Sequence, residues 1–554
     1  MTKKSLFWAD QIARKVKERA EKDDYLKKTS EEKGFICLDE KTPSGHIHIG
    51  SGRGWIIHDT VAKAMRDNGM DAKFILSADD YDPFDKIPSY LEERKYNKYL
   101  GVPFKNIPSP RPGYDNYADY YFKECTEKFE EFGIEAEIQS TGKSYIDGKF
   151  NEAIKIALDN ADKIQSIYER IYEESVGTEK LPFNPICEEC GKLGTTLAYE
   201  WDKENEVLKY KCEQDLVDWA EGCGHEGEIS PYDGNGKLPW KVEWAAKWFS
   251  IGVAYETAGK DHFTRKGSRE VSIAIADEVY DITPPYPSTR KNIGRGYEFF
   301  TLGGKKMSTS KGVGANFASI SEKVPPKMLR YLLVRTRPKA VIDFDPVETN
   351  KLLLLYNRYD RTERIYFDEE EDVNEKDKMH ESRIYELAHV GKLPKKLPPQ
   401  VPLGDAAMVI QAVNFDKKKA VERLKGMEAV PEKLDKKDKQ YLNERLESAE
   451  NWIKEFAPEQ YKFVIQPEVP PEAKALSSEQ KQALRELADV LEEKEIKKDE
   501  LESEIFDIAK RTVGPKKFFQ ASYKALIGKS HGPRLGPFIM SLDKEFVIKR
   551  LNLE

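Results

Sequence analysis

Apolar runs and turn residues alternate in the first part of the chain in a strand, helix, strand order. Residues 34–38 form a short apolar run, and residues 41–45 continue it as a turn. Apolar positions then recur at helical spacing over residues 51–68, Gly69 ends that helix, and residues 72–77 form the next strand. This order predicts a β-turn-α-β unit of a doubly wound nucleotide-binding sheet, at the very start of the fold.

Helical spacing of apolar positions dominates the remainder of the chain. It predicts helices over residues 118–132 and 150–174, and strand and helix patterns resume over residues 240–281. The acidic residues 368–372 and the proline-rich residues 393–402 predict solvated linkers. Beyond them the pattern is almost entirely amphipathic helix without an internal repeat. An α/β part is therefore expected to precede a helical part.

Length and composition set the broad class of protein. A chain of 554 residues is too long for one hydrophobic core, so two to four domains are expected. A hydrophobic content of 39% with 34% charged residues is typical of a soluble protein rich in exposed helix. Apolar runs such as residues 352–355 are too short to span a membrane. Asp10 interrupts any signal-peptide core, which predicts a cytoplasmic protein.

The net charge of −8 gives no general indication of nucleic-acid binding, so neither DNA nor a membrane is expected as a partner. A local basic face on an acidic body is still compatible with RNA binding, because the field near a surface depends on the charges close to it.

Four of the six cysteines lie close together in the chain and have the spacing of a zinc site. Two thiolates in a C-x-x-C pair can hold one side of a tetrahedral Zn²⁺, and a second pair completes the site. Residues 194–210 alternate apolar and polar positions, which predicts the hairpin of a zinc ribbon. The expected ligands are Cys187, Cys190, Cys212 and Cys223. Four protein ligands would leave no open position, so the metal would be structural.

Other interpretations of the cysteines stay open. The four could be reduced free thiols, and His225 is a reserve ligand because the second pair is more widely spaced. Cys37 and Cys125 stand alone and are expected to be small buried hydrophobic residues.

Candidate chemistry gathers first in residues 42–51, between the first strand and its helix. Glycines let the backbone approach a ligand closely, and a helix N-terminus offers free N–H groups and positive dipole to phosphate. His48 would add a further donor to phosphoryl oxygens. The alternative is that His46 and His48 are metal ligands or ordinary turn residues.

The second candidate loop, residues 303–312, combines small residues with closely spaced lysines and suits a clamp on a polyphosphate. By itself it could equally be an exposed basic turn. A Walker P-loop is disfavoured, because the two Gly-Lys-Ser triplets lack the upstream glycine: Glu137 and Tyr523 occupy that position.

Taken together and in this order, the two loops resemble the signature motifs of class I aminoacyl-tRNA synthetases. The first appears as residues 48–51, His-Ile-Gly-Ser, and the second as residues 306–310, Lys-Met-Ser-Thr-Ser. Each departs from the family pattern at one residue, since Ser51 replaces a second histidine and Thr309 replaces a second lysine. Lys311, one position later, is the candidate to supply the missing charge.

Further landmarks resemble the class I lysyl-tRNA synthetase family in particular. They are Trp-Lys-Val-Glu-Trp at 240–244, Gly-Lys-Asp-His at 259–262, Gly-Tyr-Glu at 296–298, Asp-Asp-Tyr-Asp-Pro at 79–83, and the C-terminal stretch 523–538. The likeness therefore covers nearly the whole chain. Two departures are Glu40, where glycine is usual, and Asp85, where arginine is usual.

The resemblance implies ATP with Mg²⁺, L-lysine and tRNA(Lys) as substrates and partners, and it assigns roles to individual residues. The implied catalytic residues are His48, Ser51, Lys306 and Lys311. The implied ATP site comprises Gly45, His48, Gly50, Gly259, Asp261 at the ribose, Lys306, Met307, Ser308 and Ser310. The implied lysine site comprises Thr42, Asp80, Trp240, Glu243, His262 and Tyr297.

The residue types agree with a lysine pocket, in which a carboxylate pairs with the ammonium and aromatic rings cover the methylenes. For each aromatic residue the alternative is ordinary core packing. The implied reaction forms lysyl-adenylate and then esterifies the tRNA 3′-terminal ribose, at the 2′-hydroxyl by the class I resemblance.

The expected architecture is an α/β fold: a split Rossmann-type parallel sheet with an inserted zinc ribbon, followed by an all-helical anticodon-binding domain. The expected segments are 1–185 and 234–305 for the two halves of the catalytic domain, 186–233 for the ribbon, 306–367 for the lysine loop and connecting helices, and 368–554 for the helical domain.

Three other functions stay open: a class I synthetase for glutamate or arginine, an adenylate-forming ligase that uses no tRNA, and a non-catalytic tRNA-binding protein with a zinc ribbon.

Overall fold

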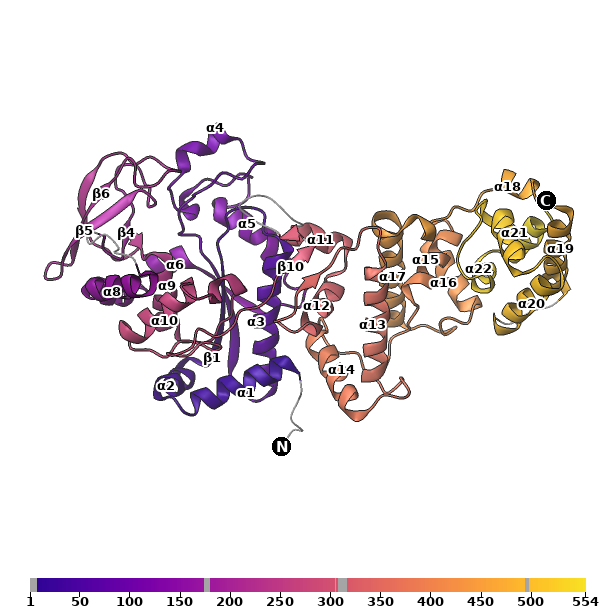
Figure 1. Cartoon of the computed structure of the whole chain (residues 1–554), viewed down its shortest axis with the longest axis horizontal. Coiled ribbons are helices and arrows are strands. Elements are labelled where there is room, and N and C mark those ends of the chain that lie inside the picture. The colour runs from indigo at the N-terminus through magenta and orange to yellow at the C-terminus, as the bar shows by residue number, and fades with distance from the viewer. Residues whose placement is uncertain (1–6, 174–179, 304, 307–315, 494–497) are drawn as a thin grey trace. The chain divides into compact units, whose positions relative to one another are not determined.

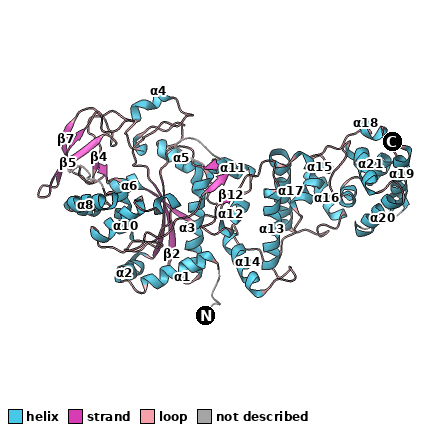
Figure 2. Ribbon diagram, in the orientation of Figure 1, coloured by secondary structure: helices cyan, strands magenta, loops and turns pink. Residues whose placement is uncertain are grey.

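The computed structural model contains two compact units, which are described separately (Figure 1). It describes residues 7–173, 180–303, 305–306, 316–493 and 498–554. The first unit comprises Met1–Glu322, Leu329–Phe344 and Asn374–Leu393, and the second comprises Lys323–Met328, Asp345–Val373 and Pro394–Glu554. All strands of the described residues belong to the first unit, whereas the second is helical (Figure 2). The division into five segments stays a prediction.

A four-stranded parallel sheet forms the centre of the first unit. Its order is β3 (Ala136–Ser140), β2 (Ala72–Ala78), β1 (Phe35–Lys41) and β9 (Val253–Tyr255), and α3 (Ile49–Asp67) connects β1 to β2. The predicted β-turn-α-β unit is therefore confirmed. Because β9 follows the cysteine-containing insert in the chain, two separate stretches of sequence build one sheet, as expected for a split Rossmann-type fold.

The apolar runs of the strands are buried in the manner of a parallel sheet, whose strands are covered by helices. Ile36 and Ile75 belong to one core cluster with Val242 and Trp248, which lie on and just after α9 (Trp240–Lys247). Helix α3, which connects these two strands, packs against both β1 and β2. The ends of the strands are thus held rigidly where the loops of the candidate site begin.

Two helices precede the sheet, so the prediction that the β-turn-α-β unit opens the fold is wrong. They are α1 (Trp8–Ala20), which packs on α3, and α2 (Asp24–Lys33). Asp23 caps α2 by accepting a hydrogen bond from the backbone N–H of Leu26 at 3.0 Å. The apolar stripe on these helices is narrow among many charged residues, which hid it in the sequence.

The helical predictions before the insert were too long. Where one helix was expected over residues 118–132, the structure has α5 (Tyr117–Thr126). The region 150–174 holds two helices, α7 (Asn151–Asp159) and α8 (Ala161–Tyr172). Asn160 separates α7 from α8 and leaves the helical backbone conformation. Asparagine competes for backbone hydrogen bonds and commonly interrupts helices in this way.

The cysteine-containing insert is an antiparallel β structure, and the predicted hairpin is confirmed. β5 (Thr196–Asp202) pairs with β6 (Val207–Cys212), which pairs with β7 (Glu226–Ile229). At the base of the insert, β4 (Asn184–Pro185) pairs with β8 (Gly236–Lys237). From β8 the chain returns to the four-stranded parallel sheet.

The second unit consists of helices joined by short loops. The predicted linkers, residues 368–372 and 393–402, are fully described and contain neither helix nor strand. Among the described residues no helix is long and apolar enough to cross a membrane. The main helices are α13 (Lys351–Tyr366), α15 (Leu403–Ala412), α16 (Lys417–Gly426), α17 (Lys436–Asn451), α19 (Ser478–Glu493), α20 (Lys498–Arg511), α21 (Pro515–Ile527), α22 (Leu535–Ser541) and α23 (Lys544–Leu551).

Candidate active site

A cavity of about 260 Å³ lies where the carboxyl ends of β1, β2 and β9 meet the N-terminal part of α9. Open parallel sheets bind their ligands at this edge, because the loops that follow the strands converge there. Its walls combine carboxylates with two tryptophans: the lining residues are Asp39, Glu40, Lys41, Thr42, Asp79, Asp82, Trp240, Glu243, Trp244, Glu256, Thr257, Ala258 and His262.

Four of the six residues assigned to lysine binding line this cavity together. They are Thr42, Trp240, Glu243 and His262. Thr42 donates its hydroxyl to Asp82 at 2.9 Å, and Trp240 is 48% exposed. The His262 ring lies edge-on to Trp240, with the ring centroids 6.0 Å apart. The cavity therefore has a partly open aromatic wall and polar groups in its interior.

The other two assigned residues are described but do not line the cavity. Asp80 points toward the start of α6 (Thr141–Ile146), where it accepts hydrogen bonds from the Gly142 N–H at 2.7 Å and the Ser140 hydroxyl at 2.5 Å. Tyr297 lies against α3, and a Cβ on Gly54 would be 2.8 Å from its phenol oxygen. Their roles in lysine binding stay predictions.

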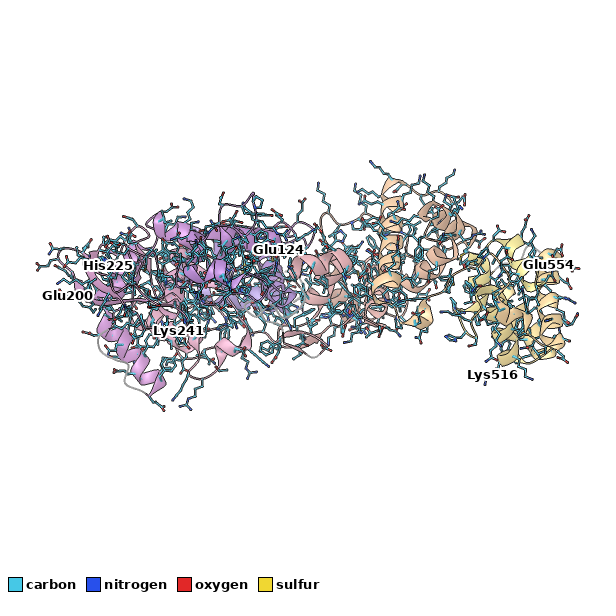
Figure 3. The ribbon with its side chains drawn as sticks, turned by 90° about the horizontal axis from the view of Figure 1, so that it is seen from above. Glu124, Glu200, His225, Lys241, Lys516 and Glu554 are labelled. Carbon is cyan, nitrogen blue, oxygen red and sulfur yellow. The ribbon has the colours of Figure 1, made fainter. Side chains whose placement is uncertain are left out.

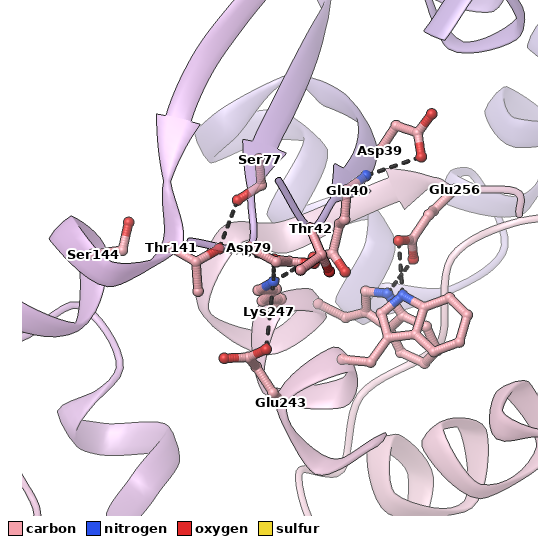
Figure 4. A network of polar contacts seen from close by, with 12 residues as sticks. Asp39, Glu40, Thr42, Ser77, Asp79, Thr141, Ser144, Glu243, Lys247 and Glu256 are labelled. Carbon is pink, nitrogen blue, oxygen red and sulfur yellow. Dashed lines mark hydrogen bonds and ion pairs between the residues drawn. The ribbon is translucent and has the colours of Figure 1, made fainter. Parts of the chain in front are cut away.

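Lys247 lies behind the cavity wall and is surrounded by carboxylates (Figure 4). Its ammonium is 2.5 Å from Asp79, 2.9 Å from Glu40 and 3.6 Å from Glu243. The side chain is 1% exposed. Burial opposes its charge, but Asp79, Glu243 and Glu40 raise the pKa of Lys247 well above its ordinary value, so this lysine stays charged.

Lys237, at the end of β8, is the second buried ammonium of the site. It contacts Asp82 and, at 3.0 Å, Oε2 of Glu243, the same oxygen that Lys247 faces. Burial opposes charge on it, while Asp82 and Glu243 raise the pKa of Lys237 above its ordinary value. Glu243 also accepts a hydrogen bond from the Tyr145 hydroxyl at 2.8 Å. The carboxylate at the centre of the cluster is thereby fixed from three sides.

The charges of this cluster do not balance. Burial raises the pKa of Glu40 well above its ordinary value, which favours the neutral form of this carboxyl group. The carboxylates of Asp79, Asp82 and Glu243 share two ammonium groups, so one negative charge remains in excess. Of the other two carboxylates in the lining, Asp39 lies 3.3 Å from the His58 ring and Glu256 is bound by Arg269. Buried charges are normally paired, so such a cavity is suited to a cationic ligand.

The histidine loop places the N-terminus of α3 next to this cavity. His48 is the N-cap of α3, and Gly50 and Ser51 belong to its first turn. At Gly45 the hydroxyl oxygen of Tyr90 lies close to the backbone, since a Cβ there would be 2.3 Å from it and Tyr90 would have to move. The free N–H groups of a helix start attract phosphate, which agrees with the role predicted for this loop.

The two ends of the lysine loop are described, and one of them meets the histidine loop. Lys306 lies in β11 (Lys305–Lys306), which pairs with β10 (Phe300–Leu302). On the far side of the loop, Asn316 pairs with His48 through the backbone, and the Phe317 N–H donates to the Ile47 carbonyl at 2.9 Å. Met307, Ser308, Thr309, Ser310 and Lys311 lie outside the described residues.

Residues 259–261, which include the Asp261 assigned to the ATP ribose, adjoin the cavity, because Ala258 and His262 on either side of them line it. Gly259 pairs with Tyr297 through the backbone, and a Cβ on Gly259 would meet no atom within 4 Å. Asp261 is exposed two residues later. This open backbone leaves room for a ligand beside the cavity.

The four cysteines of the insert form a second candidate site. Their sulfurs all lie within 4.8 Å of one another, with Cys187 3.6 Å from Cys223 and Cys190 3.7 Å from Cys212. A tetrahedron of thiolates at the usual zinc–sulfur bond length has sulfur–sulfur edges of about 3.8 Å, so the cluster has the dimensions of a metal site. His225, which Figure 3 labels, does not belong to this group of four ligands.

The sequence does not predict the part that Lys237 and Lys247 play in this cluster, nor that Asp79 and Asp82 line the cavity beside the predicted Asp80. One signal was available for Lys247, because it follows Glu243 by four residues on α9, a spacing that places both on one helix face. No comparable signal existed for Lys237, whose partners come from other elements.

The chain is similar to known proteins over nearly its whole length. A family model described as "tRNA synthetases class I (K)" matches residues 6–391, and one described as "Anticodon binding domain" matches residues 407–553. A lysine–tRNA ligase of Methanosphaera stadtmanae is 35% identical over 99% of this chain and all of its own length. The lysine–tRNA ligase of Methanocaldococcus jannaschii is 32% identical, with the same coverage.

Among solved structures, a glutamate tRNA ligase of Elizabethkingia meningosepticum is 13% identical, with a TM-score of 0.39, covering 94% of this chain and 98% of its own. The family match and the full-length relatives agree with each other. The chain belongs to the class I lysyl-tRNA synthetase family.

Proposed function

We propose that this protein activates L-lysine with ATP and transfers it to the 3′-terminal ribose of tRNA(Lys). The observation that carries the substrate assignment is the excess of negative charge around Lys237 and Lys247, beside the N-terminus of α3. A cationic side chain would restore the charge balance in the cavity, and Trp240 would cover its methylenes. Glutamate, as an anion, would meet repulsion there.

In the first step, a carboxylate oxygen of lysine attacks the α-phosphorus of ATP and the bond to pyrophosphate breaks. In the second, the 2′-hydroxyl of the terminal ribose attacks the adenylate carbonyl, loses its proton and releases AMP. The substrates bring their own nucleophiles, so the protein chiefly positions them and stabilises developing charge. Mg²⁺ is expected with the ATP phosphates.

The residues proposed to act on ATP come mainly from the histidine loop and the lysine loop. His48 and the N–H groups of the first turn of α3 act on the phosphates from one side, and Lys306 acts from the lysine loop, with Lys311 as second charge. Gly45 and Gly50 allow close approach of ATP, and Asp261 binds its ribose. Met307, Ser308 and Ser310 complete the ATP site. Each of these roles is a prediction that mutation can test.

The four cysteines are proposed to bind a structural Zn²⁺. This structural role needs no open ligand position, because four thiolates complete the coordination of the metal. The metal would hold the turns on either side of β5 and β6 together and so order the insert. The helical second unit is proposed to bind the anticodon arm of the tRNA.

The function predicts a specific amino-acid dependence. ATP–pyrophosphate exchange measured across the twenty amino acids, with and without tRNA, should be highest with lysine. Charging of purified tRNA should follow the same order. Arginine is the informative competitor, because it is also a cation. Robust charging with arginine or any other amino acid while lysine is inert would overturn the assignment.

The metal site predicts a defined stoichiometry. The unaltered protein should contain about one zinc per chain, and Cys190→Ser should remove it and lower the thermal stability of the insert, because metal binding and local folding are one process. Cys125→Ser, at a buried cysteine outside the cluster, is the control and should keep the zinc. Metal analysis that finds no zinc in the unaltered protein would contradict the proposal.

The lysine loop predicts a defect in the rate of activation. Lys306→Ala should lower single-turnover adenylate formation roughly a hundredfold or more, about 2–4 kcal/mol, with little change in lysine affinity. Lys311→Ala should approach the same size, whereas Thr309→Ala should be mild. Lys305→Ala, which removes the same charge one residue earlier, is the control. A normal rate for Lys306→Ala would exclude this loop from the mechanism.

A further inference from the structure

The second unit contains a cavity of its own, of about 390 Å³, between α15, the segment that follows α17, and the loop before α22. Its floor is apolar and aromatic, formed by Met408, Trp452, Tyr461, Phe463 and Pro537. The rings of Trp452 and Tyr461 pack edge-on with centroids 5.0 Å apart. Tyr461 is partly exposed, whereas Trp452 and Phe463 are buried. An aromatic ring that is partly open to solvent is the usual platform for an unstacked base.

One polar atom in this wall has no partner. Trp452 is fully buried, and its indole N–H has no hydrogen-bond partner within the part of the chain that the structure describes. Buried N–H groups are nearly always paired in folded proteins, so this unpaired N–H sets Trp452 apart from the other lining residues.

The rim of the cavity is polar and carries charges of both signs, because Asp405 lines the cavity together with Arg534. Gln460, His531 and Arg534 are exposed there. Arg534 is oriented by Glu502, whose two carboxylate oxygens are each 2.9 Å from one of its nitrogens. Lys529 donates to the Lys462 carbonyl at 2.8 Å and so ties the loop to the segment that carries Tyr461. The rim can therefore offer donors in defined positions.

A basic hollow adjoins the same two helices. Its charged lining residues are Lys418, Lys419, Arg423 and one acid, Glu422, all of α16, and Met540 of α22 completes it. Helix α15 packs against both α16 and α22. Lys418 and Lys419 are exposed, and in the described residues no carboxylate oxygen lies within 4.0 Å of either ammonium. Unpaired lysines beside an aromatic cavity are the arrangement that binds single-stranded nucleic acid, with bases on rings and phosphates on cations.

We propose that the cavity around Tyr461 and Trp452 binds one unstacked base of the tRNA anticodon loop, and that Lys418 and Lys419 contact phosphates of the same loop. This inference rests on the proposed function and specifies where the tRNA is read. The match to an anticodon binding domain covers residues 407–553 and points to no individual residue within them. Stacking supplies affinity, and the rim side chains select among bases.

The first experiment removes the platform. Tyr461→Ala should raise the KM for tRNA about 5- to 150-fold, the range expected for loss of one stacked base, while lysine-dependent pyrophosphate exchange at saturating tRNA stays unchanged. Tyr461→Phe keeps the ring and should behave as the unaltered enzyme. A thermal unfolding midpoint shared by the two variants excludes a folding defect. An unchanged KM in Tyr461→Ala would overturn the proposal.

The second experiment locates the base. Transcripts of tRNA(Lys) with an abasic nucleotide at each anticodon-loop position are charged by the unaltered enzyme and by Tyr461→Ala. At one position the base deletion and the substitution should be non-additive, because both remove the same contact. Additive effects at every position would place the base elsewhere and overturn the proposal. Failure of the unaltered enzyme to charge intact tRNA with lysine would instead refute the proposed function.

The third experiment tests the phosphate contacts. The double variant Lys418→Ala/Lys419→Ala should reduce the slope of log affinity against log salt by about 1.4, since each contact to a single strand contributes about 0.7. The matched control is Lys516→Ala/Lys517→Ala on α21, which removes the same charge from another exposed lysine pair (Figure 3). Equal slopes for the two double variants would exclude α16 from the RNA contact.

Discussion

Two lysines, Lys237 and Lys247, are buried among four carboxyl groups, and this cluster joins parts of the chain that are distant in sequence. The carboxyl groups come from the ends of β1 and β2 and from α9, whereas Lys237 stands at the base of the cysteine-containing insert. Removing one partner of a buried ion pair typically costs about 3–5 kcal/mol, because the other charge is left without compensation. The cluster therefore holds the two halves of the split sheet in one geometry.

The same cluster explains how a substrate could be recognised without large rearrangement. Glu243 is fixed by Tyr145, Lys237 and Lys247, so its carboxylate is oriented before any ligand arrives. Asp79, Asp82 and Glu243 exceed the two ammonium groups by one negative charge, and a cationic side chain would balance it at the edge of the sheet where α3 begins. Recognition of the amino acid and activation of its carboxylate would then occur on adjacent elements, with their relative positions set by the fold.

The parts of this structure that the sequence predicts well are those determined locally. The strands and the helix of the first β-turn-α-β unit are short apolar segments bounded by turn residues, and the hairpin of the insert alternates clearly. Thr42, Glu243 and His262 were placed through family landmarks and do meet in the cavity. The surroundings of Asp80 show the limit, because its hydrogen-bond partner Gly142 is 62 residues away in the chain. Likewise, Lys237 becomes part of the site only through tertiary contacts.

The central claim is that excess negative charge in this cavity selects a cationic amino acid. The most direct measurement compares the affinity of two non-hydrolysable adenylate analogues by calorimetry, one carrying lysine and one carrying norleucine, which has the same chain length but no ammonium. The lysine analogue should bind at least about thirty-fold more tightly, because its ammonium pairs with buried carboxylates. Equal affinity for the two analogues would show that the cluster plays no part in recognition and would contradict this account.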